Sequence, residues 1–155
     1  HDLRHIVREE AALLAPSAQT KNIDLSVSAS NNIIAAIDDT SFRLLIRNLL
    51  NNAIAYTQPG GKVSISLSES DNQYHLVFED NGPGIPVGER DRVFERFYRI
   101  QNHEVTGCGI GLSIVMRVVE LHQASLSLND SSFDSGLKVT ISFPLSRAAA
   151  NNTSN

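Results

Sequence analysis

The chain of 155 residues contains a single cysteine, so no disulfide can form within it. It does not need one, because a chain of this length with 41% hydrophobic residues can bury about two thirds of its unfolded surface in one domain. The lone thiol, Cys108, suits a reducing compartment, and no neighbouring partner in the sequence indicates a redox switch.

Long apolar runs and clusters of basic residues are also missing. No run approaches the roughly 20 apolar residues that span a bilayer, and nothing resembles a signal peptide, so we expect a soluble segment without direct membrane contact. A formal net charge of −4 and scattered Lys and Arg residues argue against a surface that coats nucleic acid. Residues 146–155 have no aliphatic side chain larger than alanine, which predicts a disordered tail after a domain of residues 1–145.

What is present is an ordered series of helix and strand patterns. Three stretches have helical spacing: 3–14, which Pro16 is expected to end, a long stretch that Asp38 to Thr40 can cap and that runs to about Tyr56, and 112–122, opened by Gly111. Strands are predicted at 23–29, 33–37, 63–67, 74–78, 125–128 and 137–143. A long polar connection with a short helix near 89–97 has the character of a lid. We predict an α/β two-layer sandwich, with about three helices on a mixed, mostly antiparallel sheet of about five strands.

Asn48 and Asn52 lie one helical turn apart, at the border of the apolar face of the second helix. Asparagine is a mediocre helix former because its amide competes for backbone hydrogen bonds, so two at this spacing need an explanation. One explanation is a solvated stripe. The other is a cleft in which an amide oxygen joins the shell of a Mg²⁺ ion whose other ligands are waters and phosphate oxygens.

Asp80 ends a predicted strand and is followed by Asn81-Gly82-Pro83-Gly84. A simple turn would explain these residues. A carboxylate, however, only accepts hydrogen bonds, so it can receive one from the amino group of adenine but would face an oxygen on guanine. Leaving such a buried acceptor unpaired costs about 1 to 3 kcal/mol, or roughly 5- to 150-fold in affinity. Under this interpretation Asp80 selects ATP over GTP.

Alternating glycines precede the third helix at Gly107, Gly109 and Gly111, with Leu112 next. A helix N-terminus offers unpaired N–H groups and the positive end of the helix dipole to phosphates. The spacing G-x-G-x-G is also common in ordinary loops.

The segment before these glycines contains Phe94-Glu-Arg96-Phe97, followed by Arg99. The two arginines can meet phosphate oxygens bidentately, or they can be solvated residues at a helix end. The two phenylalanines are expected to anchor the lid by packing.

In order and spacing these segments resemble the N, G1, F and G2 boxes of the ATP-binding catalytic domain of bacterial two-component sensor histidine kinases. The matching segments are Asn48-Leu-Leu-Asn51-Asn52-Ala53, Asp80-Asn-Gly-Pro-Gly84, Phe94-Glu-Arg-Phe97 and Gly107-Cys-Gly109-Ile-Gly111-Leu112. The resemblance covers nearly the whole chain. It implies a Bergerat-type α/β sandwich, shared with gyrase, heat-shock chaperone and mismatch-repair ATPases, in which a lid covers the nucleotide.

The resemblance also implies a role for each matching residue. Asn52 corresponds to the magnesium-binding asparagine, Asn48 to its phosphate-side companion, Tyr56 to the aromatic beside the nucleotide, and Asp80 to the adenine-reading aspartate. The residues that match the two glycine boxes and the lid-side basic positions are Gly82, Gly84, Gly107, Gly109, Gly111, Leu112, Arg96 and Arg99.

Three positions depart from the family pattern. Ala55 stands where lysine or arginine is common, which removes one phosphate contact. Leu137 follows Gly136 where a hydroxyl residue is frequent, so a polar contribution near the base is in doubt. His122 lacks the glycines that often follow it, and we expect it to complement the dipole at the end of its helix.

The residue at position 48 decides the chemistry that the resemblance implies. Hydrolysing members of the superfamily, and serine kinases that regulate sigma factors, usually carry glutamate where this chain has Asn48, and an amide cannot act as a base. A neutral imidazole needs mainly positioning and charge stabilisation, so transfer of the γ-phosphoryl group to a histidine is favoured. Two alternatives stay open: an ATP-sensing module without phosphate transfer, and a serine kinase of the anti-sigma type.

The acceptor histidine is expected on another domain. His1-Asp2-Leu3-Arg4 superficially resembles the acceptor motif, but one short helix and then strands follow it, so His1 and His5 are interpreted as surface residues. The partners would be the dimerisation and phosphoacceptor helices of the same receptor and a response regulator, and the isolated domain would be monomeric. We expect a cytoplasmic domain of an inner-membrane sensor.

Overall fold

The structure, a computed structural model, describes residues 1–29, 32–92 and 109–145. The predicted tail at 146–155 and most of the predicted lid, residues 93–108, lie outside these described residues. In the part that is described, no helix is long and apolar enough to cross a membrane.

Within the described residues, one sheet of five strands has the order β1-β2-β3-β5-β4. Its strands are β1 (Asp24–Ser28), β2 (Lys62–Ser70), β3 (Gln73–Asp80), β4 (Ser125–Asp130) and β5 (Leu137–Pro144). β1 is parallel to β2, and the other three neighbouring pairs are antiparallel. The predicted mixed, mostly antiparallel sheet is confirmed.

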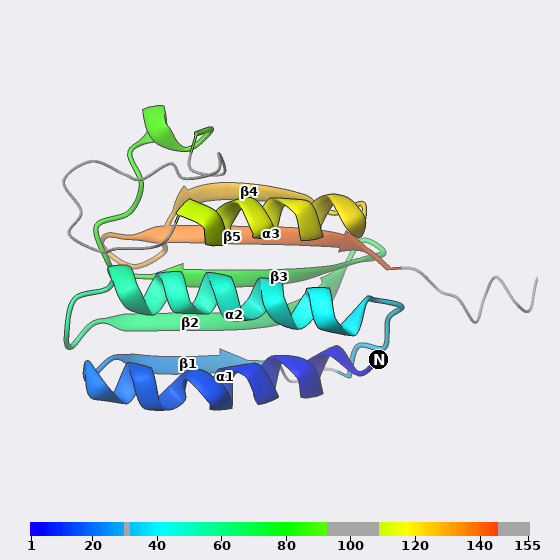
Figure 1. Cartoon of the computed structure of the whole chain (residues 1–155), viewed down its shortest axis with the longest axis horizontal. Coiled ribbons are helices and arrows are strands. Elements are labelled where there is room, and N and C mark those ends of the chain that lie inside the picture. Colours follow the sequence, from blue (N-terminus) through cyan, green and yellow to red (C-terminus); the bar gives the residue numbers. More distant parts are fainter. Residues whose placement is uncertain (30–31, 93–108, 146–155) are drawn as a thin grey trace, which may run out of the picture.

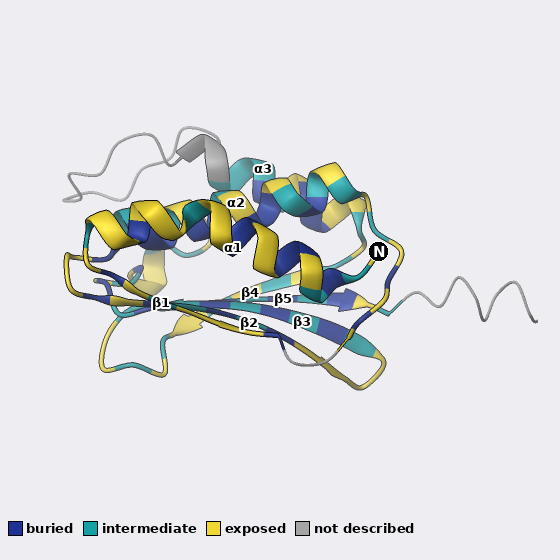
Figure 2. Cartoon of the chain, turned by 90° about the horizontal axis from the view of Figure 1, so that it is seen from below, coloured by how far each residue is buried: buried dark blue, intermediate teal, exposed yellow. Residues whose placement is uncertain are grey.

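In residues 1–29, 32–92 and 109–145, three α-helices lie on one face of this sheet, which gives two layers (Figures 1 and 2). They are α1 (Leu3–Thr20), α2 (Asp39–Tyr56) and α3 (Gly109–Leu121), and a short 3-10 helix, η1 (Val87–Glu89), follows β3. α2 is the central helix and contacts both α1 and α3. The α/β two-layer sandwich predicted from the sequence is therefore confirmed.

The core lies between the two layers, because each layer turns its apolar residues toward the other (Figure 2). In β3 every second residue is buried, as the alternating pattern predicted. On α2 the buried residues include those whose helical spacing predicted a common face: Phe42, Leu45, Ile46, Leu49, Leu50 and Ala53. The periodicity of the sequence thus identified the two surfaces that meet.

α2 begins where its capping residues predicted. Asp38 is the N-cap, and its carboxylate accepts a hydrogen bond from the backbone N of Ser41 at 3.0 Å. Asp39 lies in the first turn, where a negative charge suits the positive end of the helix dipole.

The other end of α2 is stabilised from outside the helix. The last turn carries no basic residue. Lys21, which follows α1, compensates: its Nζ donates to the carbonyl oxygens of Ile54 at 2.8 Å and Ala55 at 3.2 Å. A cation at this position complements the negative end of the dipole, and no local pattern in the sequence indicated it.

α1 is longer than predicted. It continues to Thr20 with Pro16 inside it, so the expectation that Pro16 ends the helix is wrong. A proline removes one backbone donor and crowds one preceding carbonyl. Ala18, two residues later, is only 2% exposed, so burial of the last turn in the core offsets this local penalty. The hydroxyl of Thr20 also donates to the carbonyl oxygen of Pro16 at 3.0 Å.

Residues 33–37 form no strand, which corrects a second prediction. The alternation itself is real, because Ile33 and Ala35 are buried while Ile34 is 62% exposed. The segment pairs with the start of the chain instead of the sheet: the backbone N of Leu3 donates to Ile33 O, and that of Ala35 donates to His1 O. A period of two identifies a half-buried extended segment but does not identify its partner.

Candidate functional site

Three elements that carry predicted site residues have an end at the same side of the domain (Figure 1). β3 runs antiparallel to β5, and α2 and α3 run in opposite directions, so the end of α2, the end of β3 and the start of α3 share this end. The end therefore carries Asn52, Tyr56, Asp80 and Gly109.

Asp80 is a buried carboxylate. The residue is 7% exposed, and no cationic side chain of the described residues forms an ion pair with it. Its Oδ1 accepts hydrogen bonds from the backbone N of Gly82 at 2.9 Å and of Leu137 at 3.4 Å. Burial raises the pKa of the Asp80 carboxyl; these two hydrogen bonds oppose the rise, and neighbouring Glu79 adds to it. Such a group gains most from a ligand that offers a hydrogen-bond donor.

Glycines allow three backbone segments to approach one another around Asp80. A Cβ on Gly82 would lie 2.9 Å from the carbonyl oxygen of Tyr56. A Cβ on Gly136 would lie 1.9 Å from the carbonyl oxygen of Asp80, and the φ of Gly136 is +116°. Gly84 lies against Gly136. The interpretation of residues 81–84 as a simple turn is thus incomplete, because these glycines also pack the loops tightly around the carboxylate.

Leu137 contributes to the site through its backbone. Its N–H is one of the two donors to Asp80, and this donor does not depend on the side chain. That an apolar side chain at position 137 removes a polar contribution stays a prediction. The backbone contact could not be predicted, since it follows from the pairing of β3 with β5.

The two asparagines of α2 have different environments. The Nδ2 of Asn48 donates to the carbonyl oxygen of Leu44, one turn earlier, at 2.8 Å, which is the local competition with the helix backbone that asparagine is known for. The Nδ2 of Asn52 is buried and has no hydrogen-bond partner within the described part of the chain. Buried polar atoms are nearly always paired, so the Asn52 amide is a candidate for contact with a ligand.

The donor set suits a magnesium ion that arrives with a phosphate. The described residues contain no group of three or more His, Cys, Asp or Glu that could hold a metal alone. An amide oxygen is a hard ligand, and Mg²⁺ usually keeps several waters and binds substrate phosphates. The Asn52 side chain makes no hydrogen bond within the described residues, so its Oδ1 is available for such a partial shell, while the unpaired Nδ2, which only donates, would face an acceptor such as a phosphate oxygen.

Thr57 was not identified from the sequence as a site residue. It is 1% exposed, and its Oγ1 has no partner among the residues that the structure describes. Its backbone N donates to the carbonyl oxygen of Ala53 and closes α2. In the sequence a threonine before Gln-Pro-Gly-Gly indicates only a helix end, so nothing local distinguished this hydroxyl.

α3 begins at Gly109, two residues before the predicted opening at Gly111. Gly109, Gly111 and Leu112 therefore all lie in the first turn, whose N–H groups have no partner within the helix. Leu112 is partly buried against the core. Other candidates lie outside the described residues: Gly107, Cys108, Arg96, Arg99, Phe94 and Phe97.

The geometry thus combines a buried hydrogen-bond acceptor, an unpartnered buried amide and a helix N-terminus at one end of the domain. This combination suits a ligand with a donor-bearing ring at one end and anionic groups at the other.

Comparison with known proteins agrees with this description. Residues 37–147 match the family described as "Histidine kinase-, DNA gyrase B-, and HSP90-like ATPase". The sensor histidine kinase TmoS of Ectopseudomonas mendocina is 34% identical over 158 residues, which cover 97% of this chain and 16% of TmoS. The chain spans only 16% to 30% of the length of such curated relatives.

Solved structures give the same result. The mycobacterial sensor histidine kinase MprB superposes with a TM-score of 0.83 at 30% identity, over 94% of this chain and 97% of that chain. The histidine kinase ThkA, solved in complex with the response regulator protein TrrA, has a TM-score of 0.80 at 22% identity, over 94% of this chain and 41% of that chain, and supports the fold. The chain belongs to the histidine kinase-, DNA gyrase B- and HSP90-like ATPase family, and within it to the catalytic domains of sensor histidine kinases.

Proposed function

We propose that this domain binds Mg-ATP and donates the γ-phosphoryl group to a histidine on a separate phosphoacceptor domain. The observation that carries the proposal is Asp80, a buried carboxylate held by two backbone N–H groups and by no cation of the described residues. The amino group of adenine would donate to it, whereas the oxygen of guanine would leave it unpaired. Tyr56, Gly82 and Gly84 would shape the surroundings of the base.

The phosphates would lie toward α2 and α3. Asn52 would hold the magnesium ion, and the N–H groups of the first turn of α3, with Gly109 and Gly111, would donate to phosphate oxygens. To contact a phosphate, the side chain of Asn48 would first have to break its hydrogen bond to the carbonyl oxygen of Leu44. Mg²⁺, when bound, neutralises part of the phosphate charge.

Three residues outside the described ranges complete the proposed phosphate contacts. Gly107, Arg96 and Arg99 are assigned there on the family pattern alone, as backbone and side-chain donors to phosphate oxygens.

The proposal of a histidine acceptor rests on the absence of a carboxylate at position 48. The amide of Asn48 accepts no proton, so it would not activate a water molecule or a serine hydroxyl. The neutral imidazole of a histidine already carries a lone pair and needs no base. The domain would then act by positioning and by charge stabilisation.

The proposed partners come from the names of similar proteins. TmoS is named a sensor histidine kinase, and ThkA was solved with a response regulator. We infer that the helices with the acceptor histidine belong to the same receptor, that a response regulator takes the phosphoryl group, and that this domain lies on the cytoplasmic side of an inner membrane. The isolated domain is proposed to be monomeric.

The decisive experiment mixes the domain with separately prepared phosphoacceptor helices of its receptor and γ-labelled ATP. We expect acid-labile, base-stable label on the helices. Binding of Mg-ATP without transfer would favour the ATP-sensing module, for which Ala55 and Leu137 give some support because each removes a predicted polar contact. A stable serine ester on a regulatory protein would favour the serine kinase, against which Asn48 argues.

A further inference from the structure

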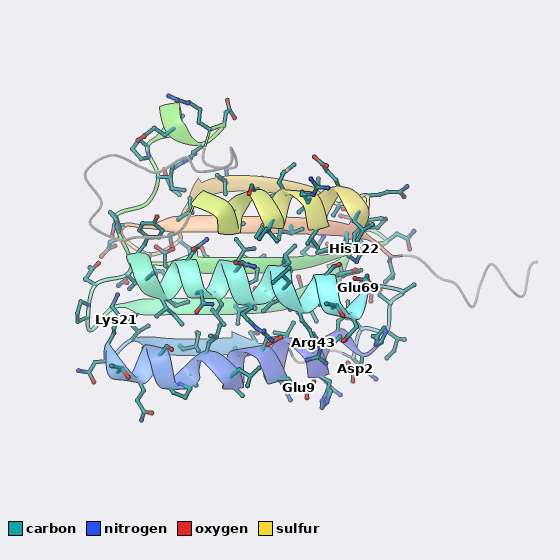
Figure 3. All side chains as sticks on the ribbon, in the orientation of Figure 1. Asp2, Glu9, Lys21, Arg43, Glu69 and His122 are labelled. Atoms are coloured by element: carbon teal, nitrogen blue, oxygen red, sulfur yellow. The ribbon has the colours of Figure 1, made fainter. Side chains whose placement is uncertain are left out.

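A hollow of about 530 Å³ lies at the end of the helical layer opposite Asp80 and Asn52. It opens where α2 begins, α3 ends, β3 begins and β5 ends (Figures 1 and 3). The lining residues used below are Ile37, Asp38, Tyr74, Leu121, His122 and Pro144. A volume of this size is within the range of small-molecule sites, and the proposed nucleotide chemistry uses none of these residues.

Tyr74 presents an unpaired hydroxyl to this hollow. The residue is 2% exposed, and its ring stacks on Phe143 with centroids 4.7 Å apart and an interplanar angle of 5°. Its hydroxyl makes no hydrogen bond to any residue of the described ranges, although the side chain lines the hollow. Burial raises the pKa of the Tyr74 phenol, so the group stays neutral and keeps both a donor and an acceptor. Because Tyr74 lines the hollow, its hydroxyl is available there to a ligand as a donor or as an acceptor.

The imidazole ring of His122 lines the hollow and is held between two backbone groups. Its Nε2 faces the backbone N of Asp38 at 3.1 Å, and its Nδ1 faces the carbonyl oxygen of Val118 at 2.9 Å. A backbone N–H only donates and a carbonyl only accepts, so Nδ1 carries the proton and the ring is neutral. His122 therefore complements the end of its helix, as expected, by a hydrogen bond from Nδ1 to a last-turn carbonyl oxygen. Its edge packs against Phe143.

Among the described residues, two carboxylates lie near the hollow, and the N-terminal ammonium group donates to the carbonyl oxygen of Ala35, next to lining residue Ala36, at 3.0 Å. Hydrogen bonds from the hydroxyl and the backbone N of Ser41 lower the pKa of the Asp38 carboxyl, which is exposed and ionised at neutral pH. Glu69 is the cross-strand partner of Tyr74. α3 also ends here without a basic residue in its last turn, so the hydrogen bond from His122 Nδ1 to Val118 O is not accompanied by a charged side chain of that turn.

We propose that this hollow binds a small organic monocation with an apolar body, such as an arylalkylammonium ion. The ammonium group would donate hydrogen bonds to the carboxylate of Asp38 and to the hydroxyl oxygen of Tyr74. The apolar body would pack against Ile37, Leu121 and Pro144. The site is separate from the nucleotide site and does not depend on the function proposed for it.

The test is an NMR titration of the ¹⁵N-labelled full chain with 2-phenylethylammonium chloride and, as a neutral control of the same shape, 2-phenylethanol. We expect the cation to shift the amide signals of Asp38, Tyr74, Leu121 and His122, to bind more tightly than the alcohol, and to lose affinity as salt is added. Mg-ATP binding should not change. Equal affinity for cation and alcohol, or shifts centred elsewhere, would overturn the proposal.

Two conservative variants sharpen the test. Tyr74→Phe keeps the ring stacking and removes only the hydroxyl, and we expect a loss of about 2- to 12-fold in affinity for the cation. Asp38→Asn keeps a good N-cap, and since the carboxylate is exposed we expect a loss of up to about fivefold for the cation and none for 2-phenylethanol. Asp134→Asn, which removes an exposed charge on the distant loop, should change neither affinity. Unchanged binding in Tyr74→Phe and Asp38→Asn would disprove the assignment.

Discussion

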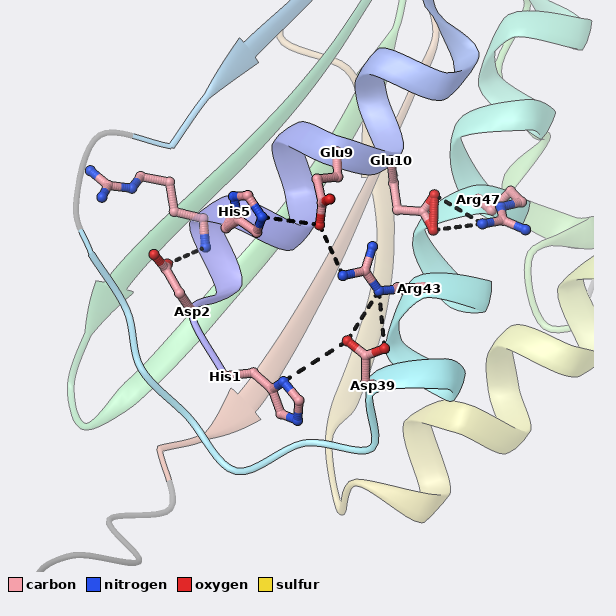
Figure 4. A network of polar contacts seen from close by, with 9 residues as sticks. His1, Asp2, His5, Glu9, Glu10, Asp39, Arg43 and Arg47 are labelled. Atoms are coloured by element: carbon pink, nitrogen blue, oxygen red, sulfur yellow. Dashed lines mark hydrogen bonds and ion pairs between the residues drawn. The ribbon is translucent and has the colours of Figure 1, made fainter.

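Two regions of this domain differ in whether their polar side chains have partners. Between α1 and α2, charges are paired across the helices (Figure 4). Glu9 accepts from Arg43 at 2.9 Å and lies 3.3 Å from His5, and Arg43 also pairs with Asp39 at 3.0 Å. Glu10 is fully buried, and both of its oxygens accept from Arg47, at 2.8 and 3.1 Å.

At the proposed nucleotide end the polar groups have no such partners. Asp80 is buried without a cation of the described residues, and Asn52 and Thr57 each keep a buried polar atom that is unpaired within the same ranges. A buried polar group without a partner opposes folding by about 1 to 3 kcal/mol. The comparison indicates that the first region stabilises the fold, whereas the second is retained for a ligand. Substitutions in the first region should therefore lower stability, whereas substitutions in the second should weaken ligand binding without lowering stability.

The largest expected effect is on stability. Arg47→Met leaves the buried carboxylate of Glu10 unpaired, and because Arg47 itself is 49% exposed we expect the cost of an unsatisfied buried acceptor, about 1 to 3 kcal/mol. Urea unfolding measures it. Arg117→Met, at an exposed arginine on α3, is the control and should stay within about 0.5 kcal/mol of the wild type. An equally small effect of Arg47→Met would remove the Glu10–Arg47 pair from the account of stability.

Asp80→Asn should lower ATP affinity without lowering the stability of the fold. We expect ATP affinity, measured by calorimetry, to fall about 5- to 150-fold, because the amide no longer offers the adenine amino group a carboxylate. Asp71→Asn, at an exposed hairpin residue, should leave the affinity unchanged.

The same variant makes a pH prediction. The folded-state pKa of Asp80 is raised by burial, so the folded state binds the proton more tightly than the unfolded state does. Ionisation of this group therefore lowers the stability of the wild type as pH rises above 3.8, the ordinary pKa of an aspartate. Relative to the wild type, Asp80→Asn should gain stability with rising pH and show no gain once Asp80 is protonated. Thermal unfolding at several pH values measures the difference, and a gain that grows toward acid would contradict the assigned direction.

Asn52→Ala should abolish the effect of magnesium on ATP affinity while changing the free energy of unfolding little, because its Nδ2 makes no hydrogen bond within the described chain. Calorimetric titrations with and without Mg²⁺ measure this effect. Asn51→Ala, at the exposed neighbouring position, should retain the full magnesium effect. A magnesium effect that persists in Asn52→Ala would exclude Asn52 as a ligand.

The smallest effect is expected for Arg43→Ala. Hydrogen bonds to Glu9 and Asp39 raise the pKa of the Arg43 guanidinium, but the pairs are partly exposed and their charges are screened. We expect a loss of about 0.2 to 1 kcal/mol that diminishes in high salt. A loss that does not depend on salt would indicate packing of the side chain instead of charge.

Much of the fold could be predicted because its signals are local. The face of α2 from Phe42 to Ala53 and the cap at Asp38 depend on residues within a few turns of one another. The errors have the opposite cause. Pro16 lies inside α1, and Ile33 pairs with Leu3, because contacts distant in sequence prevailed over the local preference.

The site shows the same division. Asp80, Asn52 and the glycines could be selected by residue type and order, since the chemistry of a carboxylate, an amide or a missing side chain is intrinsic to the residue. Tertiary structure alone decided that Asp80 is buried without a cation of the described residues, that the backbone of Leu137 supports it, and that Tyr74 lines a hollow at the other end of the domain. Whether a side chain is buried, and which groups it bonds to, depends on residues that the sheet and helices bring together from distant parts of the chain. The linear sequence does not contain the distances between those residues.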